Sequence, residues 1–229
     1  MKISEEGIVP EDMARNGSGT AETREGDGTN IGAELRELPP LSFNQRLKIA
    51  MDISCCLNYL HNEKAIPHGN LKTSNILLQN PDLNPLLTDY SLHRIMNPSG
   101  TAEQVLNAGA LGYRPPEFAN SSKPCPSLKS DVYAFGVILL ELLTGKCAGE
   151  IVSAMSGAVD LTDWVRMLAS GSRWTECFDR LMISDNDIVK DALPKGVHEM
   201  LQVGLKCILP ASERPDIRTV FEDLSSIVL

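Results

Sequence analysis

The sequence predicts a mainly α-helical domain at residues 39–229 with one small β-ribbon, preceded by a polar segment at residues 1–38. One reason is that apolar residues recur at three- and four-residue intervals in several segments of the domain, which is the spacing of one helix face. Another is that Ser, Asp or Gly stands at the ends of several of these segments, where such residues cap helices. A chain of 229 residues can bury a sizeable core.

The leading segment, residues 1–38, has no such periodicity and is rich in Gly, Glu, Asp, Thr and Asn. Residues 1–40 hold four Lys/Arg and nine Asp/Glu, and so carry 4 − 9 = −5 of the formal net charge of −9. A segment of this composition buries too little apolar surface to offset the entropy lost on ordering. We therefore expect a disordered acidic tail at 1–38.

The first half of the domain predicts one helix and then two strands. Ser42 followed by Gln45 forms a capping-box pattern, and helical spacing of apolar residues continues to about Asn62. Two short apolar runs, at 76–78 and 86–88, are separated by Asn, Pro and Asp residues that favour a turn. These runs predict a two-stranded ribbon.

The second half predicts three further helices. Asp131 precedes an apolar run at 132–143, and Gly145 follows it, so we expect Asp131 to be the N-cap and Gly145 to end the helix. This run is apolar on every face and should therefore be buried all round. Apolar stripes near 197–208 and 217–227 predict the last two helices.

Composition narrows the function classes. The negative net charge disfavours binding to nucleic acid. The six cysteines form no C-x-x-C pair and no zinc spacing, which indicates free thiols in a reducing compartment. The sequence has no apolar run of the ~18 residues that a membrane span needs, and no apolar signal core follows Met1. The expectation is a soluble, cytoplasmic chain.

Five short motifs follow one another along the domain. They are His-Gly-Asn-Leu-Lys-Thr-Ser-Asn at 68–75, Asp-Tyr-Ser at 89–91, Gly-Tyr-Arg-Pro-Pro-Glu at 112–117, Asp-Val-Tyr-Ala-Phe-Gly at 131–136 and Glu-Arg-Pro at 213–215. In this order they resemble the catalytic loop, the D-F-G triplet, the end of the activation segment, the start of the long central helix and the arginine before the last helix of a protein kinase C-terminal lobe. The residues of these motifs resemble those of plant leucine-rich-repeat receptor-like kinases. The resemblance covers about residues 40–229 and includes no N-terminal lobe, so we expect that lobe to be missing.

The residues that carry phosphotransfer in this family are changed here. Asn70 stands where the family has its catalytic Asp, and Gly69 where it has the Arg that reads activation-loop phosphorylation. Ala110 replaces a Thr that contacts the catalytic Asp and Lys, and Ser91 replaces a Gly whose backbone is flexible. An amide cannot act as a base, so Asn70 either positions a hydroxyl or stabilises the loop.

Other positions of the family pattern are kept. Lys72 resembles the residue that offers a charge to phosphate, and Asn75 and Asp89 resemble the metal ligands on the Mg-ATP side. Each has a structural alternative: Lys72 solvated, Asn75 bracing the loop, and Asp89 accepting hydrogen bonds in a buried turn. Four further residues resemble structural positions of the family: His68 as a packed scaffold residue, Glu117 and Arg214 as a buried ion pair, and Asp131 as the holder of the catalytic-loop backbone.

The resemblance implies a receptor-like pseudokinase lobe that acts in signalling by protein–protein binding, with little or no phosphotransfer. It implies other receptor kinases or signalling proteins as partners and a place at the cytoplasmic face of the plasma membrane. No cofactor is expected beyond weak binding of Mg-ATP. Two alternatives stay open: an ATP-dependent serine/threonine kinase with an atypical catalytic loop, truncated here, and a fragment without a function.

Overall fold

The structure is a computed structural model of the 229-residue chain and describes residues 39–94, 112–119, 125–148, 160–182 and 193–227. The predicted tail at 1–38 and Ala110 lie outside these ranges. Pro40 to Leu229 belong to one compact unit, and the described parts of this unit are mainly helical.

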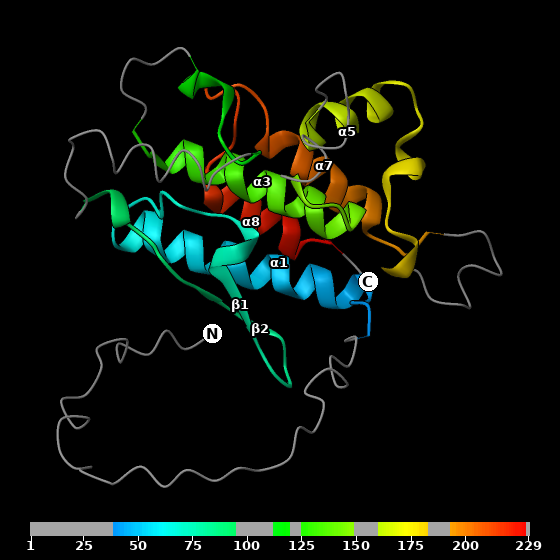
Figure 1. The fold of residues 1–229 in the computed structure, drawn as a ribbon, viewed down its shortest axis with the longest axis horizontal. Coiled ribbons are helices and arrows are strands. Elements are labelled where there is room, and N and C mark those ends of the chain that lie inside the picture. The colour runs from blue at the N-terminus through cyan, green and yellow to red at the C-terminus, as the bar shows by residue number, and fades with distance from the viewer. Residues whose placement is uncertain (1–38, 95–111, 120–124, 149–159, 183–192, 228–229) are drawn as a thin grey trace, which may run out of the picture. The chain divides into compact units, whose positions relative to one another are not determined.

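Five α-helices and one ribbon make up the described fold (Figure 1). The helices are α1 (Phe43–Asn58), α3 (Leu128–Thr144), α5 (Leu161–Ser170), α7 (Val197–Cys207) and α8 (Ile217–Ser225). The ribbon pairs β1 (Ile76–Gln79) antiparallel with β2 (Asn84–Leu87), with Leu77 opposite Leu86. A π-helical turn at Tyr59–Glu63 continues α1, and short 3-10 turns lie at Thr73–Asn75, Leu92–Arg94, Pro116–Phe118, Trp174–Cys177 and Arg180–Met182. No helix in the described ranges is long and apolar enough to cross a bilayer.

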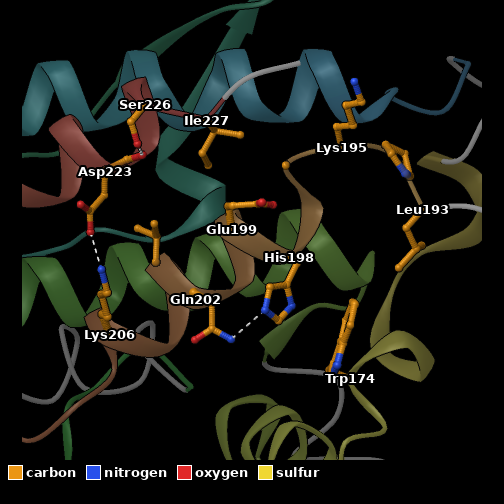
Figure 2. A pocket seen from close by; sticks show the side chains of 13 residues that line it. Trp174, Leu193, Lys195, His198, Glu199, Gln202, Lys206, Asp223, Ser226 and Ile227 are labelled. Atoms are coloured by element: carbon orange, nitrogen blue, oxygen red, sulfur yellow. Dashed lines mark hydrogen bonds and ion pairs between the residues drawn. The ribbon is translucent and has the colours of Figure 1, made fainter.

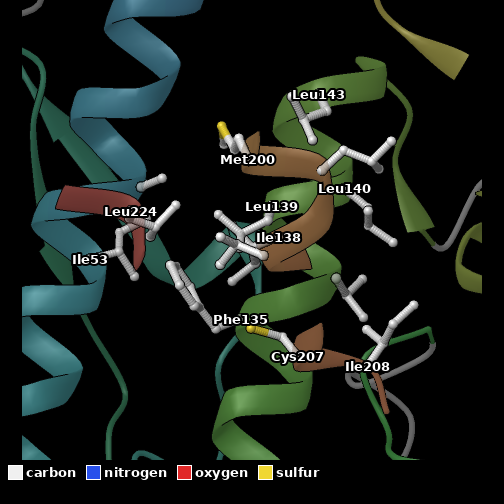
Figure 3. Packing of buried hydrophobic residues seen from close by; sticks show 14 of the residues in the cluster. Ile53, Phe135, Ile138, Leu139, Leu140, Leu143, Met200, Cys207, Ile208 and Leu224 are labelled. Carbon is white, nitrogen blue, oxygen red and sulfur yellow. The ribbon is translucent and has the colours of Figure 1, made fainter. Parts of the chain in front are cut away.

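Helix α3 forms the centre of the core. All but three of its 17 residues are buried, because α1, α5 and α7 each pack against it, and α8 packs against both α1 and α7. Figure 3 shows Phe135 and Ile138 of α3 beside Ile53 of α1, with Met200 of α7 and Leu224 of α8 close by. Full burial of one such side chain contributes about 1.5–3 kcal/mol. The predicted all-round burial of this helix is confirmed.

The helix caps agree with the sequence prediction at the start of α1 and at the end of α3, and differ from it at the start of α3. At α1 the Ser42 N–H donates to Gln45 Oε1 (2.9 Å) and the Gln45 N–H donates to Ser42 Oγ (3.4 Å), which is the predicted capping box. Gly145 ends α3 at φ +65°, also as predicted. The predicted N-cap of α3 is wrong, because Ser127 caps this helix and Asp131 lies inside its first turn. The polar residues before Asp131 already satisfy the helix end, so its carboxylate serves another purpose.

Helix α5 was not predicted. Its N-cap is Asp160, whose Oδ1 accepts from the Asp163 N–H (2.8 Å). Leu161, Val165 and Leu168 form its buried face. This i, i+4, i+7 spacing after an Asp was the signal in the sequence that could have located it.

Candidate functional site: the loop at 68–75 and the turn at 89–91

The loop at 68–75 is held by the carboxylate of Asp131. The His68 backbone N–H donates to Asp131 Oδ2 (2.6 Å) and the Gly69 N–H donates to Oδ1 (2.8 Å). His61, at the end of the first helical segment, donates from Nε2 to Oδ2 (2.8 Å). Asp131 and His61 are both buried. The central helix thus fixes the start of the loop through one carboxylate with three donors. His61 has no motif around it, so its role was not predicted from the sequence.

His68 is fully buried and neutral. Burial lowers the pKa of its imidazole, although the charges of Asp131 and Asp89 oppose this shift. Its Nδ1 accepts from the Asn70 N–H at 3.3 Å, so the proton of the neutral ring is on Nε2, which has no hydrogen-bond partner in the described part of the chain. The ring meets Tyr90 edge to face with centroids 6.4 Å apart. A neutral, enclosed imidazole serves as a packed scaffold residue.

The space next to Gly69 is occupied. Gly69 has φ +75°, and a Cβ added here would lie 2.6 Å from His93 Nδ1 and 2.9 Å from the Pro126 Cβ. Distances under 3.0 Å force a neighbour to move. A left-handed backbone also favours glycine over any residue with a side chain. An arginine would therefore not fit at this position without rearrangement of His93 and Pro126.

One hydrogen bond, from the Asn75 side chain to the Asn70 backbone, joins these two residues of the loop. Asn75 is buried and donates from Nδ2 to the Asn70 carbonyl (2.8 Å), so it braces the loop. The Asn75 carbonyl accepts from the Thr88 N–H (3.0 Å) and joins the loop to the residue before Asp89. The side chain of Asn70 is half-buried and makes no hydrogen bond to another described residue. Asn70 is therefore available as a neutral amide at the position of the family's base.

Asp89 is exposed, so the alternative that placed it in a buried turn is wrong. Its φ is +59°, and that of Ser91 is +57°. The Ser91 N–H donates to the His68 carbonyl (2.6 Å), and Ser91 Oγ donates to the Pro67 carbonyl (2.9 Å). Lys72 is half-buried in the same loop.

Two groups near the loop, an amide oxygen and a carboxylate, are of the chemical type that binds a magnesium ion. The amide oxygen of Asn75 is left over because its Nδ2 is committed to Asn70, and the Asp89 carboxylate is exposed. Magnesium prefers such oxygen ligands and is often held by one or two carboxylates together with substrate phosphates. Within the described ranges no group of three or more His, Cys, Asp or Glu side chains could hold a metal. A metal bound to Asn75 and Asp89 would therefore need a nucleotide to supply its remaining ligands.

Glu117 and Arg214 are in contact. Arg214 donates from Nη1 to Glu117 Oε1 (2.8 Å) and from Nη2 to Oε2 (3.1 Å). The guanidinium is buried, whereas the side chain of Glu117 is 32% exposed. Arg214 also donates to the carbonyls of Lys129 (2.7 Å) and Leu209 (3.0 Å). The end of the activation-segment motif is therefore tied to α3 and to the segment before α8.

A second buried network joins the loop to α3. The Tyr113 hydroxyl donates to the Glu141 carboxylate at 2.7–2.8 Å and lies 2.9 Å from Thr73 Oγ1. The Ala148 N–H also donates to Glu141 Oε1 (2.8 Å). Burial raises the pKa of Glu141, against the opposing effect of these donors. The role of Glu141 was not predicted, although an acidic residue inside an apolar helix is a signal in the sequence that a partner is present.

Two cavities among the described residues differ in size and place. A cavity of about 50 Å³ lies beside Asn70, Arg114 and Pro126. A larger one, of about 660 Å³, is lined by residues of α7, α8 and the 193–196 segment and shares no residue with the 68–75 loop. Figure 2 shows this larger cavity, where the Trp174 and His198 rings lie close together. Of these two cavities, the smaller adjoins the 68–75 loop and the larger lies apart from it.

The sequence is similar to that of known protein kinases. The sequence pattern of the protein kinase domain family matches residues 27–175, starting within the predicted tail. The chain is 55% identical over 194 residues to the leucine-rich-repeat receptor-like serine/threonine-protein kinase GHR1 of Arabidopsis thaliana. It is 52% identical over 192 residues to a probable inactive receptor kinase of the same plant. Each match covers 84% of this chain and 18% of the relative.

Two solved structures share the fold. The kinase domain of maize SIRK1 (sucrose-induced receptor kinase 1), bound to AMP-PNP, matches with a TM-score of 0.72 and 63% identity over 83% of this chain and 61% of that chain. The pseudokinase domain of BIR2, an immune regulator of the RLK/Pelle family, matches with a TM-score of 0.65 and 28% identity over 82% of this chain and 53% of that chain. The predicted fold of a protein kinase C-terminal lobe is confirmed.

Proposed function

The chain belongs to the protein kinase family and is similar to plant leucine-rich-repeat receptor-like kinases, and we propose that this lobe acts in signalling by binding other proteins without transferring phosphate. Asn70 carries the proposal. A kinase needs a carboxylate to orient the substrate hydroxyl and accept its proton, and a neutral amide supplies no base. Loss of general-base help alone costs about 10²–10⁴ in rate.

The surroundings of Asn70 support the same proposal. Gly69 has no guanidinium to pair with a phosphorylated residue, and an arginine at this position would require His93 and Pro126 to move. The lobe therefore cannot be switched through that contact. Its binding surface is set by packing and buried hydrogen bonds instead of by phosphorylation of the activation segment.

The contacts that hold the lobe together are intact. Asp131 binds the loop backbone, Arg214 binds Glu117, and Tyr113 binds Glu141. These groups are charged or polar and buried or half-buried, so each would be costly to leave unpaired. A lobe that keeps its scaffold and lacks the catalytic base is suited to present a fixed surface to a partner. We propose other receptor kinases as partners, at the cytoplasmic face of the plasma membrane.

A second candidate is an ATP-dependent serine/threonine kinase with an atypical loop. Lys72, Asn75 and Asp89 favour it, because they retain the residue types that would hold phosphate and metal. The SIRK1 kinase domain was solved with AMP-PNP bound, and GHR1 is named a serine/threonine-protein kinase. Asn75 and Asp89 would supply two metal ligands in this candidate, which supports weak binding of Mg-ATP and not catalysis.

Incubation of the 229-residue chain with labelled ATP, Mg²⁺ or Mn²⁺ and a generic protein acceptor tests the proposal. We expect no incorporation above a blank without protein. Asn70→Asp alone should not restore activity, because Gly69 and its surroundings remain. Incorporation by the unmodified chain that Asp89→Ala abolishes would show the second candidate to be correct.

A further inference from the structure

We infer that Ser91 locks the 89–91 turn onto the start of the 68–75 loop and thereby positions Asp89. The inference rests on the proposed function in one point only, the weak Mg-ATP binding of the second candidate, in which Asp89 would face a metal. Ser91 is a positioning residue, since its own hydroxyl is bound to the Pro67 carbonyl.

The lock consists of two hydrogen bonds from one residue. The Ser91 N–H donates to the His68 carbonyl at 2.6 Å, and its hydroxyl donates to the carbonyl of the preceding residue, Pro67, at 2.9 Å. Both acceptors belong to the segment that Asp131 fixes through the His68 and Gly69 amides. The turn is therefore tied to a part of the backbone that the central helix holds in place.

The backbone conformation makes the side-chain bond necessary. Ser91 has φ +57°, a left-handed conformation that residues with a Cβ avoid. Nothing in the intrinsic preference of serine selects this geometry, so contacts must stabilise it. The Ser91 hydroxyl provides one of these contacts, and the Cβ also restricts the alternatives that a glycine would sample.

Asp89 depends on this lock because its own side chain is not anchored. Its carboxylate makes no hydrogen bond to another described residue, and its φ is +59°. On its N-terminal side the Thr88 N–H donates to the Asn75 carbonyl (3.0 Å), and on its C-terminal side the Ser91 N–H donates to the His68 carbonyl. Two backbone bonds to the loop thus flank Asp89. If the second is loosened, the orientation of Asp89 relative to Asn75 is no longer fixed.

Two variants of the full chain separate the parts of the lock. Ser91→Ala removes the hydroxyl and keeps the Cβ, whereas Ser91→Gly removes both. Ser172 gives a matched control, because it also has a positive φ (+56°) and is exposed, and its hydroxyl makes no hydrogen bond to another described residue. Ser172→Ala and Ser172→Gly therefore test a positive-φ serine without the lock.

Amide hydrogen exchange at residues 90–94 is the main readout, with amides of α7 as the internal reference. In Ser91→Ala the amides at 90–94 should exchange about fivefold faster than in the unmodified chain, as expected for loss of one hydrogen bond. In Ser91→Gly they should exchange faster still. The three-bond HN–Hα coupling of Asp89, which reports φ, should change in Ser91→Gly. The Ser172 variants should leave both quantities as in the unmodified chain.

Equal exchange at 90–94 in the unmodified chain and both Ser91 variants would overturn the inference. So would a change of the same size in α7, because that would be global destabilisation. These results are independent of phosphotransfer: label incorporation by the unmodified chain would contradict the proposed function and leave the lock standing.

Discussion

Arg214 and Glu117, 97 residues apart in the sequence, are joined by two parallel hydrogen bonds of 2.8 and 3.1 Å. The guanidinium is buried, lies over the Tyr133 ring at 5.0 Å and donates to two backbone carbonyls besides the carboxylate. All of its donating nitrogens are therefore engaged by acceptors. This single side chain connects the activation-segment end, α3 and the approach to α8.

The pair predicts an acid-sensitive part of the stability. Burial alone would raise the pKa of Glu117, but the hydrogen bonds and charge of Arg214 outweigh burial and the net pKa is lowered. A carboxylate with a lowered folded-state pKa contributes stability above its unfolded pKa of about 4.3 and loses it as pH falls through the folded value. Glu117→Gln should therefore be less stable than the unmodified chain near neutral pH, and the difference should shrink in acid.

Denaturant unfolding of both chains across the acid range measures this difference. The stability gap should be largest above about pH 5 and should narrow below about pH 4. A gap that stays constant over this range would contradict the assignment of the lowered pKa to the ion pair.

Asp131→Asn should be strongly destabilising. The carboxylate accepts from His61, His68 and Gly69, and an amide would direct N–H groups at some of these donors. Breaking a buried charged contact costs about 3–5 kcal/mol. Asp223→Asn is the control, because Asp223 pairs with Lys206 at the surface, where such pairs contribute about 0–1 kcal/mol. Similar losses in thermal unfolding for both variants would contradict the role of Asp131.

Tyr113→Phe tests the second network. Removing the hydroxyl leaves the buried Glu141 carboxylate with one fewer donor, at a cost of about 1.5–3 kcal/mol for a hydrogen bond to a charged group. Tyr90→Phe is the control: Tyr90 is 53% exposed and should change stability by less than about 0.5 kcal/mol.

The Glu141 carboxylate contributes to stability with a pH dependence of opposite sign to that of Glu117, although the costs of Tyr113→Phe and Glu117→Gln should both be largest near neutral pH. Burial raises the pKa of Glu141, so its contribution is present below the unfolded pKa of about 4.3 and is lost as pH rises through the folded value. Loss of the Tyr113 donor raises this pKa further. The stability cost of Tyr113→Phe should therefore be larger near neutral pH than in acid, and a cost that grows on acidification would contradict it.

Much of the lobe could be predicted from the sequence because local rules and the overall fold agree there. The capping box at Ser42, the end of α3 at Gly145 and the ribbon pairing of 76–79 with 84–87 follow from turn and cap chemistry. The position of Asp131 was misjudged because two nearby serines, Ser127 and Ser130, also form a capping box. Several residues could have capped α3, and tertiary contacts with the loop decided the role of Asp131.

The site could be predicted only where a linear motif exists. The 68–75 and 89–91 motifs lie next to each other as the resemblance implied, since Thr88 and Ser91 bond to Asn75 and His68. The contributions of His61, His93 and Glu141 depend on contacts between residues far apart in the chain, and no spacing rule reveals them. The left-handed backbone of Asp89 and Ser91 is also invisible in a sequence, because neither residue type prefers it strongly.

The most direct measurement compares the melting temperatures of Arg214→Ala, Lys72→Ala and Arg173→Ala. Arg214→Ala leaves a cavity and two carbonyls without their donor, and should cost about 3–5 kcal/mol of a total that is only about 5–15 kcal/mol. Arg173 also pairs with a carboxylate, Glu176, but both side chains are exposed, so Arg173→Ala should melt as the unmodified chain does. Lys72→Ala, in the motif whose chemistry is lost, should shift the melting temperature far less than Arg214→Ala. If Arg214→Ala and Lys72→Ala melt alike, the division into a retained scaffold and a lost catalytic function is wrong.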